Sequence, residues 1–139
     1  MSQESVELLL RGYRAFLAAD LATLEALLDP DVEWAGAGGE ATVVSRDSVL
    51  DVLRERVAEA YHVTVDRAIG LSDRVVVSMR FSRVETDESD DRLLQSRRSY
   101  LLGRYAAIVH MRDGRVTRVV EYPHLAAALA AEGLEDDNP

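Results

Sequence analysis

The sequence contains no cysteine, no lysine and no long apolar run among its 139 residues. The absence of cysteine excludes a disulfide scaffold, a thiolate metal site and a cysteine nucleophile. The absence of lysine excludes Schiff-base chemistry. No apolar run approaches the roughly 20 residues of a membrane-spanning helix, and the N-terminus is acidic and polar, unlike a signal peptide. These absences predict a cytoplasmic protein.

The length predicts about one domain, which we expect to cover residues 1–139, and an apolar content of 47% is enough for one core. The net charge of −9 is concentrated in two short acidic patches. These patches consist of Asp87, Glu88, Asp90, Asp91, Glu135, Asp136 and Asp137. They predict an acidic loop over about 86–92 and a disordered tail over about 135–139. An acidic chain without a basic stripe also argues against binding to nucleic acid.

The first half of the chain has the apolar periodicity of three helices, over about 4–19, 21–28 and 45–60. Asp20 is placed to cap the second helix, and Pro30 to stop it. In the second half the pattern changes to period two, which predicts strands over 62–65, 75–85, 99–112 and 115–123. Asp113-Gly114 is a strong hairpin signal between the last two strands, and a short helix over 125–132 follows them.

Helices followed by strands predict an α+β fold in which the helices cover one face of a mostly antiparallel sheet. The two-residue turn sets a register that places Ala106 opposite Glu121 and Ile108 opposite Val119. The predicted inner face is made of Arg104, Ala106, Ile108, His110, Arg112, Arg115, Thr117, Val119 and Glu121. The predicted outer face carries Tyr105, Val109, Met111, Val120 and Tyr122. Such an apolar outer face predicts a homodimer.

Two segments carry a resemblance to a known family. Leu21 to Trp34 reads Leu-x-x-Leu-x-x-Leu-Leu-Asp-Pro-Asp-Val-Glu-Trp, and Met111 to Tyr122 contains Met-Arg-Asp-Gly-Arg-Val followed by Glu-Tyr. With the element order, they resemble the SnoaL-like branch of the nuclear-transport-factor-2-like superfamily. The resemblance implies a cone-shaped curved sheet around three N-terminal helices, with a deep apolar pocket for a hydrophobic, polyketide-like small molecule. It also implies an enzyme without a metal or an organic cofactor, although many members have no known activity.

Some of the family's site residues match similar residues in this sequence, and others do not. Tyr13 matches the tyrosine that donates to the oxyanion in ketosteroid isomerases. The isomerase general base and its second acid fall at Gly36 and Ile108, which argues against steroid-type isomerisation. Glu121 matches both the last-strand aspartate of limonene epoxide hydrolases and an acid/base residue of SnoaL-type cyclases.

The other epoxide hydrolase residues match less well. An ungapped alignment places the arginine of their Arg-x-Asp pair at Arg80 and the aspartate at Ser82. A three-residue slip offers Arg83 and Glu85 instead, and only one of the two arginines can face the pocket, because they lie on opposite faces of one strand. The water-holding tyrosine and asparagine fall at Trp34 and Gly36.

From these arguments the candidate catalytic residues are Glu121, Tyr13, Arg80 and His110, and the candidate binding residues are Trp34, Phe16, Leu53, Arg104, Ile108 and Val119. A carboxylate facing an apolar cavity suits proton transfer, but Glu121 could equally form a structural ion pair with Arg104 or Arg80. The three histidines have no metal-ligand spacing, so no metal site is predicted.

Three functions remain open at this point. The first is a cofactor-free cyclase, isomerase or dehydratase that acts through Glu121. The second is an epoxide hydrolase or an epoxide-opening cyclase. The third is a non-catalytic module for ligand binding or dimerisation.

Overall fold

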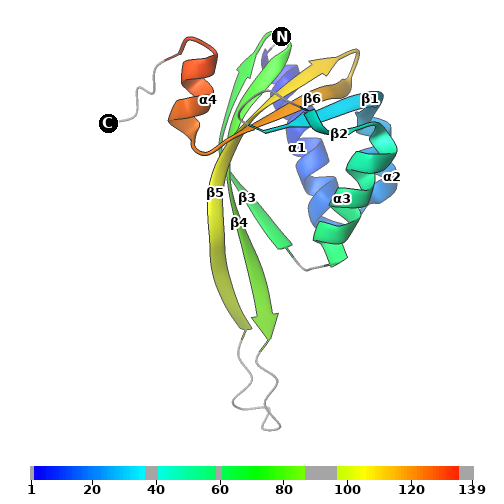
Figure 1. Ribbon diagram of the computed structural model, residues 1–139, viewed down its shortest axis with the longest axis vertical. Helices are drawn as coiled ribbons and strands as arrows, with labels where there is room; N and C mark the ends of the chain where they lie inside the picture. Colours follow the sequence, from blue (N-terminus) through cyan, green and yellow to red (C-terminus); the bar gives the residue numbers. More distant parts are fainter. Residues whose placement is uncertain (1, 37–40, 59–60, 87–96, 135–139) are drawn as a thin grey trace, which may run out of the picture.

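A computed structural model describes residues 2–36, 41–58, 61–86 and 97–134 (Figure 1). Both acidic patches predicted from the sequence lie outside these residues. The elements follow in the order α1 (Ser2–Leu17), α2 (Leu21–Leu27), β1 (Leu28–Ala35), β2 (Ala41–Val44), α3 (Arg46–Ala58), β3 (Tyr61–Leu71), β4 (Arg74–Thr86), β5 (Arg97–Arg112), β6 (Arg115–Tyr122) and α4 (Leu125–Ala131). None of the helices in the described ranges is long and apolar enough to span a membrane.

The helices form where the apolar periodicity predicts them, within about two residues at each end. Asp20 caps α2, since its carboxylate accepts a hydrogen bond from the backbone N–H of Thr23 at 3.1 Å. Hydrogen bonds from Thr23 hold the pKa of Asp20 below its ordinary value. Helix α2 ends at Leu27 and the chain continues directly into β1, whose third residue is Pro30. Strands β1 and β2 were not predicted.

The six strands form one mixed, curved sheet in the order β2-β1-β6-β5-β4-β3. The β1–β6 pair is parallel and all other pairs are antiparallel. The predicted turn between β5 and β6 is confirmed, because Asp113 and Gly114 have φ values of +54° and +76°. Positive φ at both central residues is what a type I′ hairpin turn requires. The α+β fold class predicted from the sequence is therefore confirmed.

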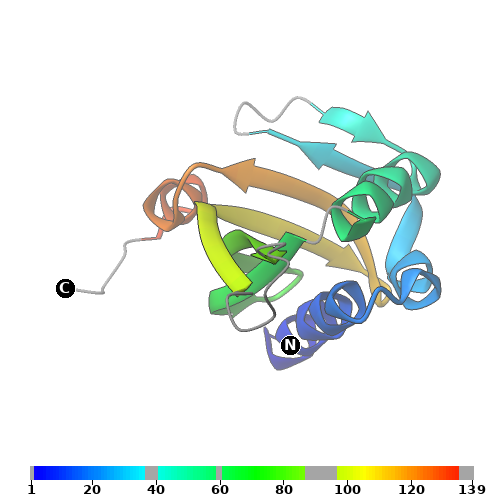
Figure 2. The ribbon, with the colours of Figure 1, turned by 90° about the horizontal axis from the view of Figure 1, so that it is seen from below.

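The helices cover both faces of the sheet rather than one, which corrects the prediction. Helices α1, α2 and α3 lie on one face, and α4 packs on the opposite face against β4, β5 and β6 (Figures 1 and 2). A buried cluster fills the space under α4: Val76, Ala106, Ile108, Ala128 and Leu129. The other buried clusters lie on the side of α1–α3 and include Val75, Val77, Ala107 and Val109.

The register predicted for the last hairpin is correct only beside the turn. Arg112 pairs with Arg115 and Met111 with Val116, but a β-bulge then leaves Thr117 without a partner residue on β5. Beyond the bulge, β6 is displaced by one residue. Because side chains alternate along a strand, the β5 residues that pair beyond the bulge lie on the face opposite to the predicted one. Val119 of β6 lies on the cavity side, as predicted.

This displacement corrects both predicted faces. Ala107, not Ala106, pairs with Glu121, and Val109, not Ile108, pairs with Val119. Tyr105, Val109 and Met111, predicted on the outer face, lie on the side of α1–α3. The predicted dimer surface therefore does not exist with those residues, because three of them face the helices α1–α3. Dimerisation itself stays a prediction.

Candidate functional site

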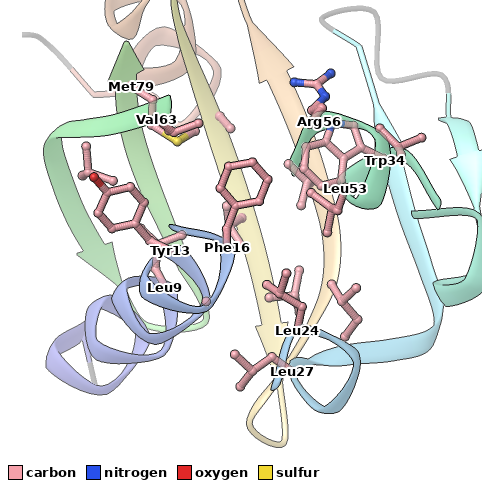
Figure 3. Close-up of a pocket in the computed structure, with 18 of the residues that line it drawn as sticks. Leu9, Tyr13, Phe16, Leu24, Leu27, Trp34, Leu53, Arg56, Val63 and Met79 are labelled. Atoms are coloured by element: carbon pink, nitrogen blue, oxygen red, sulfur yellow. The ribbon is translucent and has the colours of Figure 1, made fainter. Parts of the chain in front are cut away.

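A cavity of about 170 Å³ lies between the sheet and helices α1–α3 (Figure 3). Its lining is made of Leu8, Leu9, Gly12, Tyr13, Phe16, Leu24, Leu27, Leu28, Trp34, Val52, Leu53, Arg56, Val63, Val65, Met79, Tyr105, Ala107, Val109, Val116 and Val119. We call this space the main cavity. Arg56 is the one charged residue in this set. An apolar enclosure with a few polar groups is typical of small-molecule sites.

Two helices supply opposite walls of the main cavity. Tyr13 and Phe16 of α1 lie on one side, while Leu53 and Arg56 of α3 lie on the other, together with Trp34 (Figure 3). The α1 residues are three apart and the α3 residues three apart, so each pair lies on one face of its helix. The helical periodicity of the sequence thus places these side chains around one space.

A second cavity of about 120 Å³ adjoins the main one. It is lined by Trp34, Val43, Val49, Val52, Arg56 and Glu121. Trp34, Val52 and Arg56 border both cavities, whereas Glu121 borders only the second. The indole Nε1–H of Trp34 donates a hydrogen bond to Oε1 of Glu121. The indole therefore lies between the carboxylate and the main cavity.

The sheet register positions this pair. In the parallel β1–β6 pair, Trp34 lies beside Val119. Glu121 is two residues further along β6 and so projects from the same face. The parallel strand pair thus holds the indole next to the carboxylate.

Tyr105 and Arg56 complete the polar part of the site. Burial and, to a smaller extent, the negative charge of Glu121 raise the pKa of the Tyr105 phenol to about 12, while the positive charge of Arg56 opposes the rise. The Tyr105 ring also meets Phe81 edge to face, with centroids 5.6 Å apart. Tyr105 is therefore a neutral hydrogen-bond donor at physiological pH, and the charges of Glu121 and Arg56 both act on it.

Six of the ten residues predicted from the sequence border these two cavities. Tyr13, Phe16, Trp34, Leu53 and Val119 line the main cavity, and Glu121 lines the second. The expectation that Glu121 forms an ion pair with Arg80 or Arg104 is wrong. Its observed side-chain partner is Trp34.

The other four predicted residues lie on the opposite face of the sheet. Arg80 binds Asp66 through Nε, at 2.8 Å from Oδ1, and its register partner Arg104 is exposed. Ile108 is buried under α4. The side chain of Arg83, the alternative to Arg80, lies outside the described part of the chain.

His110 belongs to a charged cluster near α4 rather than to either cavity. Burial lowers the pKa of His110 below its ordinary value, and Arg74 lowers it further, while Glu132 and Asp73 oppose the shift. Arg74 binds Glu132 at 3.0 Å and Asp73 at 2.9 Å. The Arg74–Glu132 pair ties the end of α4 to β4, so this cluster has a structural role.

The sequence analysis did not identify Arg56 or Tyr105 as site residues. Arg56 follows Val52 and Leu53 by four and three residues, so its place on the apolar face of α3 was visible in the sequence. Tyr105 was assigned to the wrong face because the bulge at Thr117 was not foreseen. Within the described residues, no group of three or more His, Cys, Asp or Glu side chains could hold a metal ion.

Comparison with known proteins gives a sequence match and several structural ones. Residues 9–119 match the family described as SnoaL-like domain. A Kribbella flavida protein proposed to be a ketosteroid isomerase has a TM-score of 0.69 and 17% identity, covering 88% of this chain and 80% of that one. An LEH-like epoxide hydrolase of M. tuberculosis has a TM-score of 0.65 and 14% identity, covering 95% and 94%. TerC, co-crystallised with polyporic acid, has a TM-score of 0.62 and 20% identity, covering 94% and 97%.

No curated protein sequence matches the chain significantly. The structural matches have low sequence identity and show the shared fold, which hosts unrelated chemistries. The sequence match covers more than half of the chain and agrees with the curved sheet and the three N-terminal helices. The chain belongs to the SnoaL-like domain family, within the nuclear-transport-factor-2-like superfamily.

Proposed function

We propose that this protein is a small cofactor-free enzyme that binds a hydrophobic small molecule in the main cavity and moves a proton on it through Glu121. The reaction would be of the cyclase, isomerase or dehydratase type. The apolar lining supports the ligand class, since burying an apolar ligand surface is favourable by about 25 cal/mol per Å². Family membership supports the general kind of activity.

The observation that carries the proposal is the position of Glu121. Among the described residues that line the two cavities, Glu121 is the one carboxylate. Trp34 donates to its Oε1, which holds the side chain in place, and Oε2 accepts no hydrogen bond from the described residues. A positioned carboxylate of this kind can act as a general base and then return the proton as a general acid.

The position of Trp34 adds a requirement for the substrate. Because the indole separates Glu121 from the main cavity, the reacting atom must lie at the edge of the indole, where the two cavities meet. Arg56 borders both cavities and Tyr105 lines the main one, and both can donate hydrogen bonds to an oxygen of the substrate. The substrate would then place its apolar body in the main cavity and its reacting carbon near Trp34.

An epoxide-opening reaction has weaker support. An epoxide hydrolase is among the structural neighbours, but Arg80 pairs with Asp66 on the opposite face of the sheet. A non-catalytic binding module is the third possibility, and the experiment below distinguishes it from an enzyme.

The test measures proton transfer on an enolisable two-ring ketone, 1-tetralone, by following deuterium uptake beside the carbonyl by NMR in D₂O. Glu121 removes a proton from that carbon, and a deuteron from the solvent replaces it. We expect wild-type protein to accelerate uptake and Glu121→Gln to lose about 10²–10⁴-fold of that acceleration. Glu33→Gln is the matched control, since Glu33 lies next to Trp34 in β1 and therefore projects from the other face.

Each outcome has a distinct meaning. Equal acceleration by wild type and Glu121→Gln would show that Glu121 only positions Trp34. Binding of 1-tetralone without accelerated uptake by the wild type would contradict proton transfer and favour the binding module. Turnover of styrene oxide alone, measured in parallel, would favour epoxide opening instead.

A further inference from the structure

We propose that Arg56 anchors an anionic group of the ligand, so that this protein takes a flat hydrophobic acid. This inference rests on the proposed function, because it specifies the substrate class of the same site. The apolar body would fill the main cavity, and a carboxylate or similarly compact oxyanion would bind the guanidinium.

The first argument is the position of the charge. Arg56 lines both cavities, while Glu121 lines only the second one. Within the described lining, the main cavity thus has one positive group and no negative one. A ligand anion beside Arg56 on the main-cavity side has the Trp34 indole between itself and Glu121. Among the described residues that line the main cavity, Arg56 is therefore the group that can bind an anion directly.

The second argument is that the Arg56 guanidinium has no partner among the described residues. No hydrogen bond and no ion pair within 4.0 Å joins it to any of them, whereas Arg54, Arg74 and Arg80 each bind a carboxylate. A half-buried cation beside apolar walls has lost part of its hydration without a compensating partner. A ligand carboxylate would supply that partner, and the planar guanidinium can bind it through two parallel hydrogen bonds.

The helix dipole of α3 stabilises the charge of Arg56 when no ligand is bound. Arg56 lies in the last turn of α3, where the helix dipole favours a positive charge. The dipole contribution is small, on the order of 0.3–1 kcal/mol, and leaves the hydrogen-bond donors of the guanidinium available. The guanidinium is therefore held in position while its hydrogen-bond donors remain available for a ligand.

The cavity volume limits the size of the apolar body. An engineered protein cavity of about 150 Å³ binds benzene. The main cavity has about 170 Å³ and adjoins a second space of about 120 Å³. These dimensions favour an acid with one or two fused rings over a larger polycyclic molecule.

The experiment compares an anion with its neutral isostere. Calorimetric titration with 2-naphthoate and 2-naphthamide at pH 7 measures the two affinities under identical salt. The chain has a net charge of −9, so its overall field disfavours the anion. We expect wild-type protein to bind 2-naphthoate at least about tenfold more tightly than the amide, as a charge-assisted hydrogen bond predicts.

Three variants locate the source of that preference. Arg56→Met should abolish the preference for 2-naphthoate, because it removes the charge-assisted part of the anion affinity, and should weaken binding of the amide less than binding of the acid. Arg56→Lys, which keeps the charge and loses the planar fork, should retain part of the preference. Arg54→Met is the matched control, because Arg54 is on the same helix, is exposed and pairs with Asp51 at 2.9 Å. It should behave like wild type.

Several results would overturn the inference. These are equal affinities of wild type for acid and amide, equal losses for both ligands in Arg56→Met, or the same loss in Arg54→Met. Failure of both probes to bind would also overturn it. Amide binding and deuterium uptake from 1-tetralone do not depend on a ligand anion, so they show separately whether the proposed function fails.

Discussion

At the scale of single residues, Trp34 and Glu121 act as one unit. The indole donates to the carboxylate and at the same time forms the boundary between two cavities. A charge-assisted hydrogen bond of this kind contributes about 1.5–3 kcal/mol. The structural and the catalytic interpretations of Glu121 are therefore compatible, because the bond that orients the carboxylate uses one oxygen and leaves the second without a hydrogen bond from the described residues.

Tyr105 allows a prediction on pH dependence. Its pKa is about 12 in the folded protein, mainly because of burial, whereas an unfolded tyrosine has a pKa near 10. Between these values the folded state retains the proton and the unfolded state releases it. The free energy of unfolding that Tyr105 contributes is therefore complete below pH 10 and falls as the pH rises towards 12.

Urea denaturation at pH 9, 10 and 11 measures this loss. Tyr105→Phe should show a smaller decrease of the unfolding free energy above pH 10 than wild type. Tyr122→Phe makes the same chemical change on the opposite face of the sheet and serves as the control. If the decrease is equally steep in wild type and in Tyr105→Phe, another group causes the alkaline loss.

At the scale of elements, α4 contributes to the stability of the protein but lies away from the cavities. Leu129 is 2% exposed and packs with Val76 and Ile108 on the face of the sheet that is opposite the cavities. Leu129→Ala should lower the free energy of unfolding by about 2–5 kcal/mol through loss of buried surface and the cavity that it leaves. The affinity for 2-naphthamide should stay within about twofold of wild type, because no α4 residue lines the main cavity among the described residues.

Leu53→Ala gives the complementary control. Leu53 lines the main cavity, so this substitution should weaken binding of the amide in addition to reducing stability. Urea denaturation and calorimetric titration measure the two effects. A loss of amide affinity in Leu129→Ala as large as in Leu53→Ala would contradict the separation of the two faces.

The same elements show what the sequence can predict. Apolar periodicity locates the four helices, and alternation with the Asp-Gly turn locates β3, β4, β5 and β6, because those signals are local. Strand β1 was missed, since Pro30 indicates the end of a helix but not the presence of a strand around it. Its parallel pairing with β6 joins distant segments, and no local pattern encodes that pairing.

The site was predicted in part for the same reason. Residues on helices reached the cavity as expected, because a helix face is fixed by spacing alone. Strand residues were assigned from a regular register, and the single extra residue Thr117 reversed the assignment along β5. Glu121 was placed on the correct face because the β6 residues beyond the bulge keep the face predicted for them, whereas the β5 residues do not.

At the scale of the whole molecule, the distribution of charge governs the response to salt. The chain has a net charge of −9, and such an excess destabilises the compact state by self-repulsion. The ion pairs Arg54–Asp51 and Arg80–Asp66 are substantially exposed, so each contributes little and screening them costs little. Added salt should therefore stabilise the protein.

We expect the Tm at pH 7 to rise by a few degrees between about 20 and 300 mM NaCl, because the Debye length falls below about 10 Å in this range. A variant with amides in place of the seven acids of the two acidic patches tests the cause. It keeps every described contact unchanged, since those positions lie outside the described residues, and its net charge of about −2 leaves little repulsion to screen. Its Tm should rise by less than half as much as that of wild type. An equal rise in both proteins would show that salt acts on the folded body, through ion exclusion or hydrophobic contacts, and not through the excess negative charge.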